Sequence, residues 1–261
     1  VVKGSALTSS LTAGQVIKAA SSFCGPFIAA FAAGTLGNWK YLFPIYAAIT
    51  LLSATWLLAT PINEEVHSEA STSVGSVFGI LKDRTILFLF LGIFFICGVD
   101  VGVNTVSPKL LIGRAGWTVE KAGIASSVYF ICRTAGSLIG AVALSKINGI
   151  RWFRWNIIPA AIVFATLFFV KGTAAMLIVI GLTGFLCSSV FPIIYAEAMK
   201  ARPEKANEIS GLMIMGVSGG AVIPPCMGIL TDLTGNLNGS LAVIGVCLLY
   251  LLLCSLKLSK A

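Results

Sequence analysis

Long apolar stretches separated by short polar connections dominate the hydrophobic pattern of this 261-residue chain. A helix that spans a bilayer needs about 20 mostly apolar residues, with a range of about 17 to 25. The pattern predicts eight such helices, at residues 10–33, 39–60, 86–111, 122–147, 156–171, 175–199, 208–232 and 239–256. We therefore expect an all-α membrane protein.

The eight predicted helices differ in their polar content. Those at 39–60, 156–171 and 239–256 have no ionisable residue in their interiors and are expected to face lipid, whereas the pairs between them hold the glycines and most of the intramembrane charge. One apolar helix in every three is typical of a repeated three-helix unit. The polar stretch after residue 60 contains the densest acidic cluster, and we interpret it as a linker between two bundles that ends in a short interfacial helix at 76–84.

Composition agrees with this pattern, since 57% of the residues are hydrophobic and 11% are charged, against about 25% charged in soluble domains. The Lys and Arg residues outside the membrane divide unequally, with 11 on one side and 5 on the other. Cytoplasmic loops carry the excess, so both ends of this chain are predicted to be cytoplasmic. This asymmetry accounts for the net charge of +8, and we infer no nucleic-acid partner.

The chain opens at Val1 without a methionine, and its first residues lack the apolar core and cleavage site of a signal peptide. We therefore expect it to begin in the middle of a longer protein. The seven cysteines lie in apolar stretches without CxxC spacing, and His67 is the only histidine, so we expect neither a metal site nor a cofactor. Phosphate-loop and GxSxG motifs are absent from the sequence, and nothing in it indicates an enzyme.

An acid lies deep in the third predicted helix. Asp100 is 14 residues past the cytoplasmic boundary, about 21 Å into the membrane. Asn104 and Ser107 follow on the same face and can line a polar cavity. Gly98 and Gly102 flank the acid at a spacing that permits close helix approach, or the approach of a ligand to the backbone.

The next helix carries a matching polar face of Ser126, Tyr129, Arg133 and Ser137, with Arg133 about 16 Å from the opposite boundary. A charge at the bilayer centre costs at least about 2.5 kcal/mol, so we expect Arg133 and Asp100 to meet in a hydrated interior. The pair has two interpretations: a site for substrate binding or gating, and a permanent salt bridge that only fixes helix packing.

Three further groups are weaker candidates. Gln15 and Lys18 share a face of the first helix with Ser22, although Lys18 can also extend to the lipid headgroups. Glu197, near a cytoplasmic helix end, is a candidate gate or loop partner of Lys200 or Arg202, or is simply solvated. Tyr195 and Phe191 suit packing as well as ligand stacking.

Residues 211–235 combine Gly216, Gly219, Gly220, Pro224 and Pro225, which weaken a continuous helix. Such breaks mark moving or binding segments in transporters, and the same small residues also permit close packing. The two interpretations are compatible.

Several motifs resemble the major facilitator superfamily, specifically its fucose/glucose/galactose:proton symporter group. The stretches at 97–104, 185–199 and 218–235 are similar to that group's seventh, tenth and eleventh helices, and those at 24–31 and 39–49 to its fifth and sixth. One departure is at 140–151, where Ser145 or Lys146 replaces the usual acid of the loop after helix eight.

The resemblance implies a division of the chain into three parts. Residues 1–60 would be the last two helices of the N-terminal bundle, 61–84 a cytoplasmic linker, and 85–261 the C-terminal six-helix bundle; the first four helices of the same protein are missing. It also implies alternating access in a bacterial inner membrane. Members of the sugar group generally carry their proton-coupling acids in the N-terminal bundle, so Asp100 is our own candidate proton carrier.

We therefore predict a proton-coupled secondary transporter of a sugar, such as a monosaccharide, or a similar small polar solute. Asp100, Asn104 and Arg133 would bind its hydroxyls or exchange partners between states. An exporter of drugs or organic anions is one alternative, since Arg133 suits a carboxylate and Gly25 and Pro26 are similar to a drug-antiporter feature. A non-transporting remnant or membrane sensor is another, motivated by the missing helices.

Overall fold

The computed structural model describes residues 11–14, 16, 21, 24, 25, 28, 31, 32, 34–61 and 74–258, and the regular elements among these residues are all helices. The elements are η1 (Trp39–Tyr41), α2 (Leu42–Ala59), α3 (Val74–Gly79), η2 (Ile80–Lys82), α4 (Arg84–Ala115), α5 (Val119–Ala122), α6 (Ile124–Leu144), α7 (Gly149–Thr166), α8 (Thr173–Cys187), α9 (Val190–Ala201), η3 (Pro203–Lys205), α10 (Ala206–Met215), η4 (Gly216–Ser218), α11 (Gly219–Thr234) and α12 (Asn238–Leu258).

Six helical segments within this described part are long and apolar enough to cross a membrane: Trp39–Ala59, Arg84–Ala115, Ile124–Leu144, Thr173–Ala201, Pro203–Thr234 and Asn238–Leu258. The predicted count of eight is therefore not reached. The span expected at 10–33 falls mostly outside the described residues. The span expected at 156–171 overlaps a helix, Gly149–Thr166, that is not among these six.

The fifth predicted helix was misplaced along the chain. It begins at Gly149 and ends at Thr166 instead of spanning 156–171, so its N-terminal turns contain Arg151 and Arg154. The reason is a cap: the side chain of Asn148 accepts hydrogen bonds from the backbone N–H groups of Ile150 and Arg151. An N-cap asparagine fixes a helix start at that point despite the charges that follow it.

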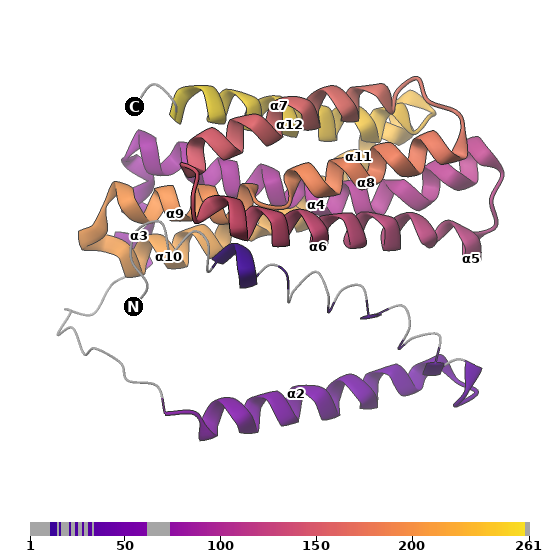
Figure 1. Cartoon of the computed structure of the whole chain (residues 1–261), viewed down its shortest axis with the longest axis horizontal. Helices are drawn as coiled ribbons and strands as arrows, with labels where there is room; N and C mark the ends of the chain where they lie inside the picture. The colour runs from indigo at the N-terminus through magenta and orange to yellow at the C-terminus, as the bar shows by residue number, and fades with distance from the viewer. Residues whose placement is uncertain are drawn as a thin grey trace.

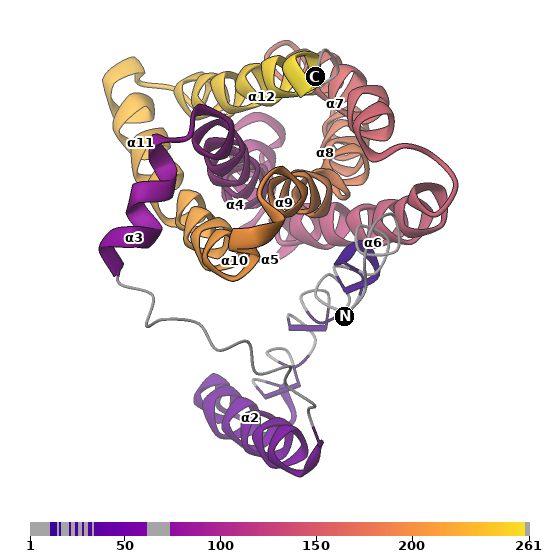
Figure 2. The same ribbon diagram turned by 90° about the vertical axis from the view of Figure 1, so that its left-hand side faces the viewer.

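Helix α4 is the central helix of the bundle, with α6, α8, α9, α11 and α12 packed around it (Figure 2). Asp83 caps its start by accepting a hydrogen bond of 2.9 Å from the Thr85 N–H. It ends at Gly116, whose φ of 67° is the left-handed conformation that glycine adopts readily. Between these caps, nine of the large apolar side chains of α4 are buried, and this explains its place at the centre.

The glycines flanking Asp100 pack closely against α11, which is the first of the two roles expected for them. A Cβ atom at Gly98 would overlap the side chain of Ile223, and one at Gly102 would lie 3.0 Å from the Met227 sulfur. In return, a Cβ at Gly219 would collide with the backbone carbonyl of Phe94. Helices α4 and α11 therefore approach so closely that a side chain at Gly98 or Gly219 would clash with the facing helix.

The predicted break in the seventh span is present as the 3-10 segment η4, between α10 and α11. A second break was not predicted: the helix expected at 175–199 is interrupted at Ser188 and Ser189, between α8 and α9. Pro192 explains this interruption, since it has no N–H to donate to the carbonyl four residues earlier.

Helices α7 and α12 lie together on one side of the bundle, and α2 lies apart on the opposite side (Figures 1 and 2). The outward residues of α7 and α12 are large and apolar, including Ile162, Val246, Leu249 and Leu253, each more than half exposed. Helix α2 has no buried residue. Three predicted lipid-facing helices thus do expose apolar surface. The short helix predicted at 76–84 corresponds to α3 and η2, which cover residues 74–82.

Candidate functional site

Three side chains from two helices meet at one carboxylate. Asp100 on α4 accepts hydrogen bonds on its Oδ1 atom from the Tyr129 hydroxyl and from the Arg133 guanidinium, both on α6. Arg133 and Asp100 also form an ion pair, with 5% and 19% of their side chains exposed. The predicted meeting of Asp100 and Arg133 is therefore confirmed, and Tyr129 joins them.

The pair lies midway along both helices. Asp100 is 16 residues after the first residue of α4 and 15 before its last, and Arg133 is 9 residues after the first residue of α6 and 11 before its last. Since these two spans cross the membrane in opposite directions, their midpoints lie at a similar depth. The ion pair is therefore near the centre of the bilayer, where isolated charges are most costly.

Glycines hold α6 in place against α8 and against the connection between α8 and α9. A Cβ atom at Gly184 would lie 2.8 Å from the Tyr129 carbonyl oxygen and 2.9 Å from its ring, so only glycine lets Tyr129 lie this close to α8. On α6 itself, Gly136 lies against the Phe185 carbonyl and Gly140 against the Ser189 hydroxyl. These small-residue spacings, which would equally suit a dimer face, are contacts within the chain.

Unpartnered polar atoms lie on the same helix faces. Asn104, one turn beyond Asp100, has a buried Oδ1 atom without a hydrogen-bond donor among the described residues. Ser137, one turn beyond Arg133, has a buried hydroxyl in the same condition. Ser107 differs, because its hydroxyl donates to the Val103 carbonyl. A buried acceptor without a donor costs about 1 to 3 kcal/mol, so the Asn104 Oδ1 atom is left able to accept a hydrogen bond.

The other predicted site residues lie elsewhere. Glu197 pairs with Lys200 at 2.7 Å, while Arg202 pairs with Asp83, so the first of the two predicted partners of Glu197 is the one observed. Tyr195 stacks on Phe191 and its hydroxyl lies 2.5 Å from that of Ser210, which joins α9 to α10. Gln15 and Lys18 lie outside the described residues.

Sequence reasoning missed a second polar group between α4 and α11. Lys109 and Asp232 line a cavity of about 110 Å³ there, together with Thr105 and Thr231. Both charges are near predicted helix ends, where solvated residues are common, so their positions in the sequence did not indicate that they line a cavity. Their opposite signs were the available clue. In the part of the chain that the structure describes, no group of three or more His, Cys, Asp or Glu side chains could hold a metal ion.

Comparison with known proteins shows which family the chain matches. Residues 7–225 match the family model described as Major Facilitator Superfamily. A putative glucose/galactose transporter of Helicobacter pylori is 28% identical over 218 residues, which cover 81% of this chain and 52% of that protein. A glucose/galactose transporter of Brucella abortus is 24% identical over 192 residues, covering 72% of this chain and 46% of that protein.

Solved structures give the same fold. A crystal structure of the transporter FucP in the outward conformation aligns with a TM-score of 0.71 at 20% identity, and one of the Escherichia coli fucose:proton symporter FucP with 0.70 at 19%. Each alignment covers 83% of this chain and 53% of the other. The chain thus spans about half the length of the relatives that it matches.

Proposed function

Because the chain belongs to the major facilitator superfamily, whose members are transporters and not enzymes, we propose that it forms the larger part of a secondary transporter. Its solute is a sugar or a similar small polar molecule, moved by alternating access and coupled to protons. Further spans of the same protein complete it. The names of the glucose/galactose relatives and of the fucose:proton symporter support the solute class and the coupling.

The sidedness is part of the proposal. The protein is integral to the membrane with several spans, and we propose that both ends of this chain lie in the cytoplasm of a bacterium. The support is the excess of Lys and Arg on that side, including Lys200, Arg202 and Lys205.

The ion pair between Asp100 and Arg133 at the helix midpoints carries the proposal. One charge of each sign leaves the site neutral overall, and the nearby acceptor Asn104 Oδ1 is unpartnered. A sugar presents hydroxyls that donate to such acceptors and accept from a guanidinium. Midplane polar sites of this kind are where transporters bind their solutes.

The same pair suggests how protons are coupled. When Asp100 is ionised, it holds both the Tyr129 hydroxyl and the Arg133 guanidinium. When Asp100 takes a proton, the ionic attraction is lost, and Arg133 is left to bind the solute or a new partner. The bundle would then have two arrangements, one with the ion pair formed and one with it broken, and a single proton would select between them. Alternating access needs a bistable element of this kind.

The geometry favours a neutral solute over an organic anion. Arg133 would suit a carboxylate if it were unpaired, but Asp100 already occupies the guanidinium and would repel a second carboxylate. Export of drugs or organic anions therefore remains the second candidate. A remnant or sensor would keep the ion pair as a packing contact without transport.

Uptake into proteoliposomes containing the full-length protein tests the proposal. Radiolabelled glucose, galactose and fucose are compared with glucarate, with and without an inward proton gradient. We expect gradient-driven accumulation of at least one neutral sugar. Accumulation of glucarate alone would favour the anion transporter, and no uptake by a folded, monodisperse protein would favour the remnant.

Variants then test the site. Asp100→Asn is expected to abolish accumulation while sugar exchange at equal concentrations continues, because exchange needs no net proton movement. Arg133→Lys should lower both by about tenfold or more, because a lysine cannot reproduce the guanidinium geometry. The matched control is Arg151→Lys, on the exposed start of α7. Unchanged accumulation in both site variants would remove the assignment.

A further inference from the structure

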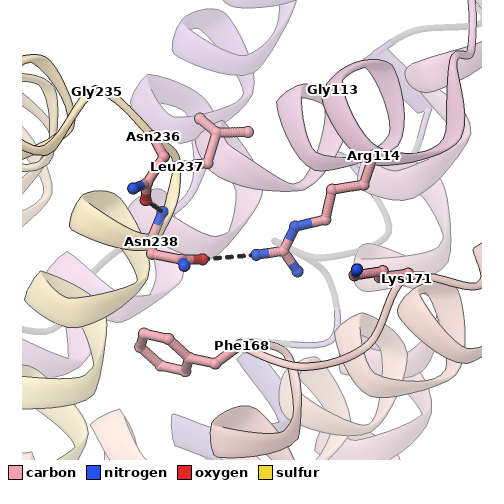
Figure 3. A pocket seen from close by; sticks show the side chains of 8 residues that line it. All are labelled: Gly113, Arg114, Phe168, Lys171, Gly235, Asn236, Leu237 and Asn238. Atoms are coloured by element: carbon pink, nitrogen blue, oxygen red, sulfur yellow. Dashed lines mark hydrogen bonds between the residues drawn. The ribbon is translucent and has the colours of Figure 1, made fainter.

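A cationic cavity lies at the end of the bundle far from the ion pair. It has a volume of about 600 Å³ and is formed by the last residues of α4 and by the connections from α7 to α8 and from α11 to α12. Figure 3 shows Arg114 and Lys171 pointing into it, with Asn236 and Asn238 across from them. No Asp or Glu is among its lining residues.

The charges of this cavity are not neutralised by carboxylates. Arg114 donates to the backbone carbonyls of Leu167 and Val170 at 2.5 and 3.1 Å and to the Asn238 side chain at 2.7 Å, all of which are uncharged. Neither Arg114 nor Lys171 takes part in an ion pair with another described residue. The cavity therefore carries two positive charges and attracts an anion.

An apolar groove continues from the cavity along the outside of the bundle. It lies between α7 and α12, has a volume of about 300 Å³ and is lined only by apolar residues and glycine. Phe168 lines both the cavity and the groove. The groove extends from Phe168 back to Ala161, which is about 10 Å along a helix.

The position of the two spaces favours one kind of occupant. The cavity lies at helix ends, the level of the lipid headgroups, and the groove lies on the side formed by α7 and α12, where Ile162 and Val246 are exposed. An anion that also carries a hydrocarbon chain, in this position, is an anionic phospholipid. We propose that the cavity binds the phosphate of such a lipid through Arg114 and Lys171 while one acyl chain lies in the groove.

Two variants separate the charge from the groove. Lys171→Gln removes a charge from an exposed side chain that makes no ion pair with another described residue. Lys121→Gln, on the exposed end of α5, is the matched control. Gly245→Leu places a branched side chain in the groove, at a position where nothing lies within 4 Å of a Cβ atom. Arg114 is left intact, since it also holds the end of α7.

Native mass spectrometry of the delipidated full-length protein measures the binding. Phosphatidylglycerol and phosphatidylcholine are titrated separately, with glycerol 3-phosphate as the soluble headgroup. We expect one tightly held phosphatidylglycerol, about fivefold weaker in Lys171→Gln, unchanged in Lys121→Gln and weaker in Gly245→Leu. Phosphatidylcholine should bind less tightly than phosphatidylglycerol to the wild type, and Lys171→Gln should not weaken phosphatidylcholine binding further.

Several results would overturn the proposal. Equal retention of the two lipids, or phosphatidylglycerol binding that neither variant weakens, would remove the site. Glycerol 3-phosphate binding as tightly as the lipid, insensitive to Gly245→Leu, would indicate a small soluble anion instead. A dimer whose formation Gly245→Leu disrupts would indicate that a second copy covers this face. None of these measurements depends on transport.

Discussion

Asp100 and Arg133 are paired across two antiparallel helices at the midpoint of each, with most of both side chains removed from solvent. Each charge is held in the membrane by the other, because an uncompensated charge at that depth is far less stable than a pair. The pair is therefore both a packing contact and a feature that protonation can open, and its variants should show two separable effects.

Removing one partner is expected to destabilise the protein strongly. Asp100→Asn leaves Arg133 buried without a counter-charge, at a cost of about 3 to 5 kcal/mol. The double variant Asp100→Asn with Arg133→Gln removes both charges and should recover part of this loss. Thermal unfolding followed by size-exclusion fluorescence measures both. A double variant no more stable than Asp100→Asn would mean that the two charges are not coupled.

The Tyr129 hydroxyl can be tested against a second tyrosine in the same bundle. Tyr129→Phe removes a hydrogen bond to a charged group, at a cost of about 1.5 to 3 kcal/mol, and should impair sugar uptake. Tyr250→Phe removes an ordinary hydrogen bond of 3.0 Å to the Phe88 carbonyl, at a cost of about 1 kcal/mol, and should leave uptake intact. Equal effects of the two variants on uptake would argue against a role for Tyr129 at the site.

Close helix packing predicts opposite effects for two glycines in one span. Gly219→Ala would place a Cβ against the Phe94 carbonyl, which is backbone and cannot move aside, so we expect a loss of stability of about 1 to 3 kcal/mol. Gly211→Ala has open space at its Cβ and a better helix propensity, so it should stabilise by up to about 1 kcal/mol. Thermal unfolding of both variants measures the difference. A stable Gly219→Ala protein would show that α4 and α11 are not in close contact.

Asp83 links the start of α4 to the end of α9 outside the membrane. The Thr85 N–H, and then the Arg202 guanidinium at 2.9 Å, lower the pKa of Asp83 below its ordinary value. A lowered folded-state pKa contributes stability that is present above the unfolded pKa, about 3.9, and is lost as pH falls through the folded pKa.

Two variants separate the contacts of Asp83. Asp83→Asn keeps the helix cap but loses the ion pair, which is partly exposed and worth about 1 kcal/mol or less. Asp83→Ala loses both, and the cap adds about 1 kcal/mol. The stability difference between wild type and Asp83→Asn should be constant from pH 8 to 5 and shrink below about pH 4. A difference that grows on acidification would contradict this assignment.

The span boundaries show which helix ends the hydrophobic pattern predicts and which it does not. The apolar stretch at 86–111 lies within α4, and that at 239–256 within α12, because the length of an apolar run is a local property of the chain. The break at Ser188 and Ser189 was missed although Pro192 follows them, since the apolar run continues through it. The start of α7 was missed because the arginines near it interrupt the apolar pattern, whereas the Asn148 cap starts the helix before them.

The sequence by itself determined that the chain is a set of membrane helices, which of them carry charge at depth, and that Asp100 and Arg133 need each other. These follow from the cost of placing charge and unpaired backbone in hydrocarbon, which applies to every residue wherever its neighbours lie. Only the tertiary structure decided that Tyr129 binds the same carboxylate oxygen, that Asn104 keeps an unpartnered acceptor, and that Arg114 and Lys171 meet at the head of an apolar groove. Those relationships depend on how helices rotate and approach one another, and glycine contacts far apart in the sequence set that geometry.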